Sequence, residues 1–125
     1  MFGELLSVFI GGGIGALLRY LVTIASKKLF LTPLFGTFIV NIIGCFLIGF
    51  LFAFTLQKAQ AISPTLKLFL TVGILGGLTT FSTLNFEVFE LIKTGKVFTG
   101  IAYMCGSCIL GLACTFLGYY ICSKI

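Results

Sequence analysis

Four runs of apolar residues, each long enough to cross a lipid bilayer, cover almost the whole of this 125-residue chain. Hydrophobic residues make up 59% of it and charged residues only 9%, far below the roughly one quarter that is usual in soluble proteins. A membrane-spanning helix needs about 20 apolar residues, so the chain has room for four such helices and little else. We therefore expect an all-α integral membrane protein, a multi-pass protein of the cell membrane. The expected single transmembrane domain covers residues 1–125, with spans near 4–25, 33–56, 66–92 and 97–122.

Positive charges lie in the short connections between these spans. An excess of lysine and arginine in short loops sets the orientation of a membrane protein. Here the bias is weak. It leaves open both a single orientation and insertion in both orientations, and the latter would permit an antiparallel dimer. The net charge of +5 indicates membrane lipid headgroups as neighbours and no nucleic acid, because the lysines form no dense cluster. One side collects Lys58, Lys67 and Lys124, and the other collects Lys27, Lys28, Lys93 and Lys96, with Arg19 as a fifth.

Five cysteines all fall inside the predicted spans, where a cysteine behaves as a small hydrophobic residue. Cys105 and Cys108 have the spacing of a redox pair, yet they lie in an apolar segment and the chain contains no histidine. The pattern therefore favours packing over metal or redox chemistry.

The first span contains a glycine-rich run that ends at an arginine. Gly11-x-Gly13-x-x-Ala16 mimics a dinucleotide-binding fingerprint, but the strand and the acidic partner that such a site needs are missing. Gly11 and Gly15 are four residues apart, which favours close packing against another helix. Arg19 lies one turn further along the same face. Two kinds of role stay open for Arg19. It reaches the lipid headgroups, or it has a functional role, either by attracting anions to a vestibule or by pairing with the backbone.

The third span is interrupted by a polar run from Gly76 to Thr83. This run contains a glycine pair, four hydroxyl groups and the ring of Phe81 where a membrane helix is normally apolar. Loosened backbone at membrane depth is tolerated only where it is buried in protein or lines a polar cavity. The run therefore predicts a break in the third helix and a path for an ion or solute.

The second and fourth spans also carry polar residues at helical spacing. Thr37 and Asn41 are four residues apart and share one face of the second span. Asn41 either bonds a neighbouring helix or offers amide donors to an anion, and the sequence leaves both open. On the fourth span Tyr103, Ser107 and Thr115 lie on one face, which favours a polar track over hydroxyls that only bond their own backbone.

The only acidic residues of the chain are Glu4, Glu87 and Glu90, and it contains no aspartate or histidine. Acids inside the membrane normally carry protons in coupled transporters. We expect headgroups to solvate Glu87 and Glu90, so that the membrane centre lacks a proton carrier. Hydroxyl and amide donors suit an anion, and the ring edge of Phe81 is also electropositive. One alternative is a small proton-coupled multidrug exporter that uses Glu87, and another is a scaffold subunit that transports nothing.

Three runs of this sequence together resemble the Fluc (CrcB-type) family of fluoride channels. They extend from Gly11 to Tyr20, from Gly36 to Gly44 and from Gly76 to Thr83. Each run alone is a weak signal, whereas the three in this order, in a chain of this length with four spans, are specific.

The resemblance implies a fluoride-selective channel, and not an enzyme, that exports cytosolic fluoride passively and so reduces its toxicity. It implies a dual-topology antiparallel homodimer with two separate pores at the interface. It also implies a structural sodium ion that is buried on the two-fold axis and is not transported. Main-chain carbonyls at the break would hold this ion, and in this sequence they belong to Gly76 and Thr79.

The resemblance also assigns residues to the fluoride pathway. Asn41 and Phe81 would line the pore, with Ser82 and Thr83 beside them. Leu84 departs from the family, which commonly has a second phenylalanine there, and a leucine has no electropositive ring edge to offer. The remaining assignments are a polar track of Thr37, Tyr103 and Ser107, and a vestibule at Arg19.

Overall fold

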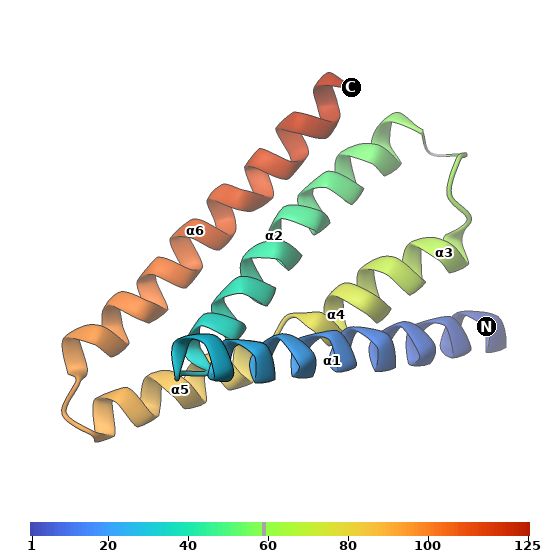
Figure 1. Ribbon diagram of the computed structural model, residues 1–125. Coiled ribbons are helices and arrows are strands. Elements are labelled where there is room, and N and C mark those ends of the chain that lie inside the picture. The colour runs from blue at the N-terminus through green and yellow to red at the C-terminus, as the bar shows by residue number, and fades with distance from the viewer. Residues whose placement is uncertain (59) are drawn as a thin grey trace.

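The computed structural model describes residues 1–58 and 60–125. In this part of the chain the elements follow one another as α1, α2, α3, η1, α4, α5 and α6 (Figure 1). Three membrane-spanning segments are single helices: α1 (Phe2–Phe30), α2 (Leu34–Gln57) and α6 (Val97–Lys124). The fourth segment, Pro64–Lys93, is divided into α3 (Pro64–Leu68), the π-helix η1 (Phe69–Leu75), α4 (Gly76–Leu78) and α5 (Phe81–Lys93).

All four segments are long enough and apolar enough to cross a bilayer, which confirms the expected all-α membrane fold. Several helices extend past the apolar runs that predicted them. α1 continues to Phe30, and its last turn carries Lys27 and Lys28. Long lysine side chains keep their stems on apolar surface while their charges reach the headgroups, so a helix can continue beyond its apolar run.

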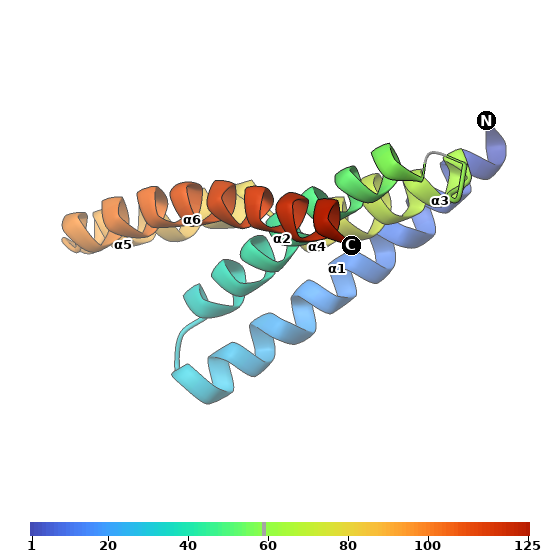
Figure 2. The same ribbon diagram turned by 90° about the horizontal axis from the view of Figure 1, so that it is seen from above.

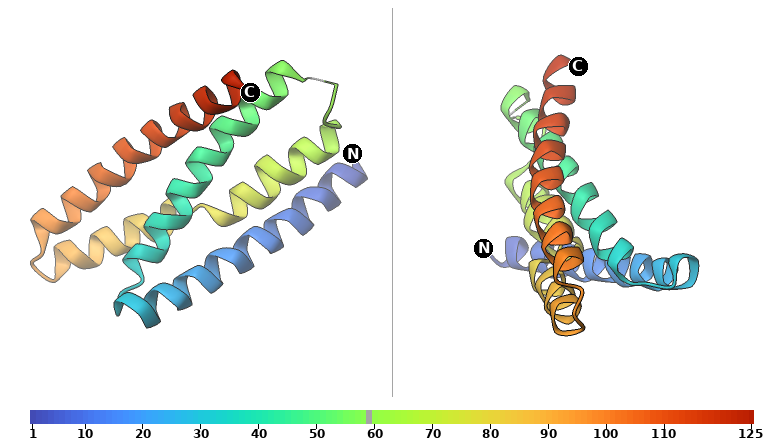
Figure 3. Two further views of the ribbon diagram at one scale, coloured as in Figure 1. Left: turned by 45° about the horizontal axis from the view of Figure 1, so that its top comes forward. Right: turned by 90° about the vertical axis from the view of Figure 1, so that its left-hand side faces the viewer.

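The helices form two pairs. α1 lies along the segment that contains η1 and α4, and α2 lies along α6 (Figure 1, Figure 3). α2 and α6 run in the same direction, because Tyr103 contacts Leu34 near one end of the pair and Gln57 contacts Cys122 near the other. Seen from above, the connection between α1 and α2 is set off to one side of α5 and α6 (Figure 2).

Glycines allow the backbones of each pair to approach closely. A methyl group built on Gly11 would lie 2.6 Å from the carbonyl oxygen of Phe69, and one on Gly15 would overlap the carbonyl oxygen of Ile74. This confirms the close packing predicted for the glycine run of the first span. In the other pair, Gly49 of α2 lies directly against the backbone of α6. Small residues at the contacts are the usual basis of helix packing in a membrane, where apolar burial alone gives little driving force.

Large apolar side chains point outward from the single chain. Phe9 is 79% exposed and Phe98 is 85% exposed, as expected of rings that face lipid. The buried apolar cluster is small and consists of Val40, Leu75 and Leu78. The inside of this fold is therefore built largely from glycines and polar side chains.

The predicted break in the third span lies at Thr79 and Thr80. Thr79 has φ −82° and ψ 152°, and Thr80 has φ −151° and ψ 118°, so both are extended between α4 and α5. The two glycines that suggested the break remain helical in α4. Gly77 instead packs against the backbone of α1 at Gly12. β-branched threonines tolerate an extended backbone better than a helical one, which explains why the chain opens after the glycine pair.

Candidate functional site

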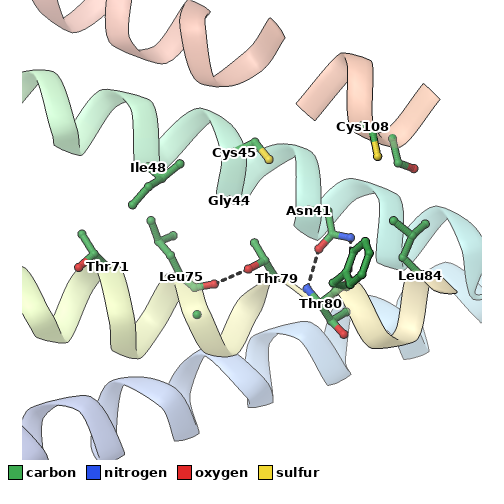
Figure 4. A pocket seen from close by; sticks show the side chains of 13 residues that line it. Asn41, Gly44, Cys45, Ile48, Thr71, Leu75, Thr79, Thr80, Leu84 and Cys108 are labelled. Carbon is green, nitrogen blue, oxygen red and sulfur yellow. Dashed lines mark hydrogen bonds between the residues drawn. The ribbon is translucent and has the colours of Figure 1, made fainter. Parts of the chain in front are cut away.

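The break is held open by the side-chain amide of Asn41 on α2. The Thr80 backbone N–H donates to Asn41 Oδ1 at 2.7 Å, and Asn41 Nδ2 donates to the Thr80 carbonyl at 3.1 Å (Figure 4). Asn41 therefore bonds a neighbouring helix, one of the two roles that its sequence context left open. One N–H of its amide group remains for another acceptor.

Arg19 lies at the same break, bonded from the opposite helix pair. Its Nε donates to the carbonyl of Gly77 at 3.1 Å, and the side chain is half-buried. Among the roles that the sequence left open for Arg19, the structure shows the pairing with the backbone. It gives a charged donor to a carbonyl of the last helical turn before the break, where carbonyls lack the amides of a following turn.

Two carbonyls at the break lose the amide that would normally bond them. In an α-helix the Thr80 amide would bond Gly76 and the Thr83 amide would bond Thr79. The Thr80 amide instead bonds Asn41, and the Thr83 amide bonds Thr80 Oγ1 at 3.2 Å. The sequence resemblance assigned a cation to these same two carbonyl oxygens.

These oxygens suit a hard cation such as sodium, which prefers oxygen ligands and is commonly held by carbonyls of interrupted membrane helices. Within residues 1–58 and 60–125, no three Cys, His, Asp or Glu side chains gather closely enough to hold a metal.

A cluster of hydroxyl groups surrounds the start of α5. Thr80 Oγ1 donates to Thr83 Oγ1 at 3.0 Å and lies 3.3 Å from Ser82 Oγ. Phe81, between them in the sequence, is 70% exposed. Thr80 thus connects Ser82 and Thr83 and also receives the amide of Asn41, a linking role that sequence reasoning did not assign to it.

A cavity of about 370 Å³ lies between α2, α6 and the break. It joins residues of the predicted pathway, Asn41, Phe81 and Ser107, to both residues of the predicted cation site. The full lining is Asn41, Gly44, Cys45, Ile48, Thr71, Leu75, Gly76, Thr79, Thr80, Phe81, Leu84, Ser107 and Cys108 (Figure 4).

Ser107 contributes an unused hydroxyl to this cavity. The side chain is only 8% exposed, and its Oγ finds no hydrogen-bond partner among the described residues. Buried polar atoms are nearly always bonded, so an unbonded one calls for an explanation such as a ligand or a water. Thr115, two turns further along α6, differs because its hydroxyl bonds the Gly111 carbonyl of its own helix at 3.1 Å.

Glu87 forms a second polar group with two residues of the predicted track. Thr37 Oγ1 donates to Glu87 Oε1 at 2.7 Å, and the Tyr103 hydroxyl donates to Glu87 Oε2 at 2.8 Å. Glu87 is 6% exposed and Thr37 is 1% exposed. The expectation that headgroups solvate Glu87 is therefore wrong: protein hydroxyls replace that solvation. Glu90, by contrast, is exposed.

The two groups lie one helical turn apart on shared helices. Asn41 and Thr37 are four residues apart on α2, and Ser107 and Tyr103 are four residues apart on α6. Because α2 and α6 run in the same direction, both steps lead the same way, from the cavity toward Glu87. The two polar groups thus form a line from the break toward Glu87, in the middle of α5.

Comparison with known proteins places the chain in a family. A family model described as "CrcB-like protein, Camphor Resistance (CrcB)" matches residues 6–119. The chain belongs to the CrcB family. The matched residues include most of each membrane-spanning segment and every residue of both polar groups.

Individual CrcB relatives are similar over nearly their whole length. A protein of Aquifex aeolicus named "Fluoride-specific ion channel FluC" is 42% identical over 118 residues, which are 94% of each chain. Proteins with the same name are 42% identical in Desulfotalea psychrophila, over 96% of this chain and 92% of the relative, and 44% identical in Clostridium perfringens, over 96% and 91%.

Sequence reasoning missed the contacts of Glu87. Glu87 is 50 residues from Thr37 and 16 from Tyr103, so no helical spacing connects the three. The available signal was the rarity of a carboxylate within a membrane segment, which by itself predicts a bonded partner. It does not say which residue that partner is.

Proposed function

We propose that this CrcB-family chain is a fluoride-specific ion channel of the cell membrane through which cytosolic fluoride leaves passively. The name shared by relatives of 42–44% identity supports the choice of ion. In the structure, the observation that supports the proposal most directly is the unbonded hydroxyl of Ser107 in the cavity beside Asn41 and Phe81. By lowering cytosolic fluoride without coupling to another ion, such a channel reduces fluoride toxicity.

The residues around the cavity fit the needs of a small, strongly hydrated anion. Fluoride leaves water only if hydrogen-bond donors replace its hydration shell along the path. Ser107 has a free O–H, and Asn41 keeps one free N–H after bonding Thr80. The electropositive ring edge of Phe81 adds a weak contact. In this cavity no lysine or arginine side chain is present to trap the anion by full charge.

The hydroxyls of Thr37 and Tyr103 act differently in this proposal, because Glu87 already accepts both. Fluoride that reaches them competes with a carboxylate for the same protons. The Glu87 carboxylate thus keeps both hydroxyls oriented while no fluoride is present. Fluoride or water accepts a hydrogen bond from one of them only when that hydroxyl rotates away from Glu87. Ser82 and Thr83, at the exposed start of α5, receive the ion at the other end of the line.

We further propose that two copies of the chain assemble as an antiparallel, dual-topology homodimer. The break places polar backbone at membrane depth, which lipid cannot solvate. Gly76 and Phe81 are exposed in the single chain, although both line the cavity at the break. A second copy over this face would bury them. The nearly even distribution of lysines between the two ends is compatible with insertion in both orientations.

The same proposal assigns the carbonyls of Gly76 and Thr79 to a structural sodium ion that the channel does not transport. When bound, the ion supplies a fixed positive charge that makes the neighbourhood favourable for an anion. The chain contributes through Asn41, which diverts the Thr80 amide, and through Arg19, which occupies the neighbouring carbonyl of Gly77. Together they leave the two ligand carbonyls free.

Fluoride efflux from liposomes that contain the purified protein tests this function. We expect efflux, followed with a fluoride electrode, without any proton gradient across the membrane. Ser107→Ala should slow it by at least about tenfold, since a hydrogen bond to a charged partner contributes roughly 1.5–3 kcal/mol. Thr115→Val is the matched control, because that hydroxyl bonds its own helix. Efflux equal to that of empty liposomes would refute the proposal.

A further inference from the structure

Two of the five cysteines line the cavity at the break. Cys45 comes from α2 and Cys108 from α6, and both lie beside Asn41 and the break (Figure 4). The other three cysteines, Cys105, Cys114 and Cys122, are not part of this lining. The sequence alone treated all five as small hydrophobic residues, and the fold separates them into two kinds.

The thiol of Cys45 reaches the surface of α6 about one helical turn from Cys108. Its Sγ packs against Gly111, where a methyl group would lie only 3.1 Å from the sulfur. Gly111 is three residues after Cys108, which is one helical turn, or about 4.5 Å along the axis, on the same face. Two helices therefore each bring one sulfur to the same cavity.

Paired thiols are ligands for soft metal ions such as Cd²⁺, whereas carboxylates and carbonyls suit hard ions. Binding breaks two S–H bonds and forms two S–Cd bonds, and two protons leave to water. No third Cys, His, Asp or Glu of the described residues joins the pair. Water or the free hydroxyl of Ser107, next to Cys108 in the chain and in the same cavity, would complete the coordination. Such a site is reversible.

We propose that Cys45 and Cys108 form a soft-metal site at which one thiophilic divalent cation bridges α2 to α6 and blocks the ion path. The blocking half of this inference rests on the proposed channel function, because the bound cation would share its 370 Å³ cavity with Asn41, Phe81 and Ser107. The binding half does not.

Inhibition of fluoride efflux by Cd²⁺ tests the block. Cys45→Ser and Cys108→Ser should each raise the half-inhibitory Cd²⁺ concentration by at least about tenfold, since each removes one of two soft ligands. Cys105→Ser is the matched control: this cysteine is on α6 too, one turn before Cys108, but outside the cavity. Inhibition should strengthen as pH rises, because both thiols must lose a proton to bind.

A second measurement follows binding without transport. The purified protein is labelled with a maleimide with and without Cd²⁺, and the labelled thiols per chain are counted by mass. We expect Cd²⁺ to protect two thiols in the wild-type protein and in Cys105→Ser, and fewer in Cys45→Ser and Cys108→Ser.

The outcomes separate the two proposals. Absent efflux without Cd²⁺ contradicts the channel function, while protection of two thiols would still support the site. Normal efflux that Cd²⁺ does not inhibit, or relief by Cys105→Ser as large as that by Cys108→Ser, overturns the block. Protection of a single thiol, unchanged in either cavity variant, overturns the bridge.

Discussion

Replacing Asn41 with alanine removes the amide that holds the break open. Both backbone groups of Thr80 then lose their partner on α2. The Thr80 N–H has an alternative, because the Gly76 carbonyl lies four residues earlier in the chain and would accept it in a continuous helix. The substitution therefore both destabilises the fold and favours a closed break, in which the Gly76 oxygen is no longer free.

The two effects differ in size. Leaving a buried backbone donor or acceptor unpaired costs about 1–3 kcal/mol per group. Hydrogen bonds between membrane helices average only about 0.6 kcal/mol, because groups that lose a partner often find another. If the Thr80 N–H rebonds to Gly76, the net loss is about 1–2 kcal/mol for the Thr80 carbonyl that remains without a partner. Channel activity, which needs the break open, should fall much further than stability does.

Fluoride efflux and thermal stability, measured on the same preparation, separate these effects. We expect Asn41→Ala to lower efflux by about 100-fold or more while the protein still purifies with a melting temperature lowered by several degrees. Asn85→Ala is the matched control, because the Asn85 amide bonds the Phe81 carbonyl of its own helix at 2.9 Å. Its efflux should stay within about twofold of the wild type, in keeping with the small effect of most exposed substitutions.

One result would contradict this reasoning directly. If Asn41→Ala conducts fluoride as the wild type does and melts at the same temperature, the amide does not hold the break. Hydrogen exchange at the Thr80 amide then shows whether that group found a new partner or was never protected by Asn41.

Further predictions concern other contacts of the same site. Tyr103→Phe leaves Glu87 Oε2 without its donor and should lower stability by about 1–3 kcal/mol, read from thermal unfolding, together with efflux. Leu84→Phe adds volume at a residue that is 4% exposed, so we expect the folding stability to fall by about 1–3 kcal/mol and the efflux not to rise. Unchanged stability would mean that the cavity accommodates the ring. Phe81→Ile should suppress efflux without changing the oligomer seen by size-exclusion chromatography, and wild-type efflux would exclude a ring contact. Replacing Na⁺ by K⁺ in the buffer should lower the melting temperature if the carbonyls of Gly76 and Thr79 hold sodium.

The sequence by itself determined the membrane fold. Apolar runs of the right length locate four spanning segments, because hydrocarbon accepts little else and the requirement is local. Gly11 and Gly15 predicted a close helix contact because their spacing is also a local property. Small residues four apart leave one face of the helix flat, whichever helix packs against it. The run from Gly76 to Thr83 also predicted the break. Its position, after the glycine pair at Thr79 and Thr80, needed the structure, because α1 packs on Gly77 and keeps it helical.

Only the tertiary structure decided which polar groups meet. Asn41 could have faced an anion or a helix, and it bonds Thr80, 39 residues away. Glu87 was expected among the lipid headgroups, but it is buried and accepts hydrogen bonds from the hydroxyls of Thr37 and Tyr103. A polar group inside a membrane must find a partner, and the sequence states that need. Which partner satisfies it depends on how the two glycine-packed helix pairs lie against each other, and that arrangement arises from all four segments packing at once.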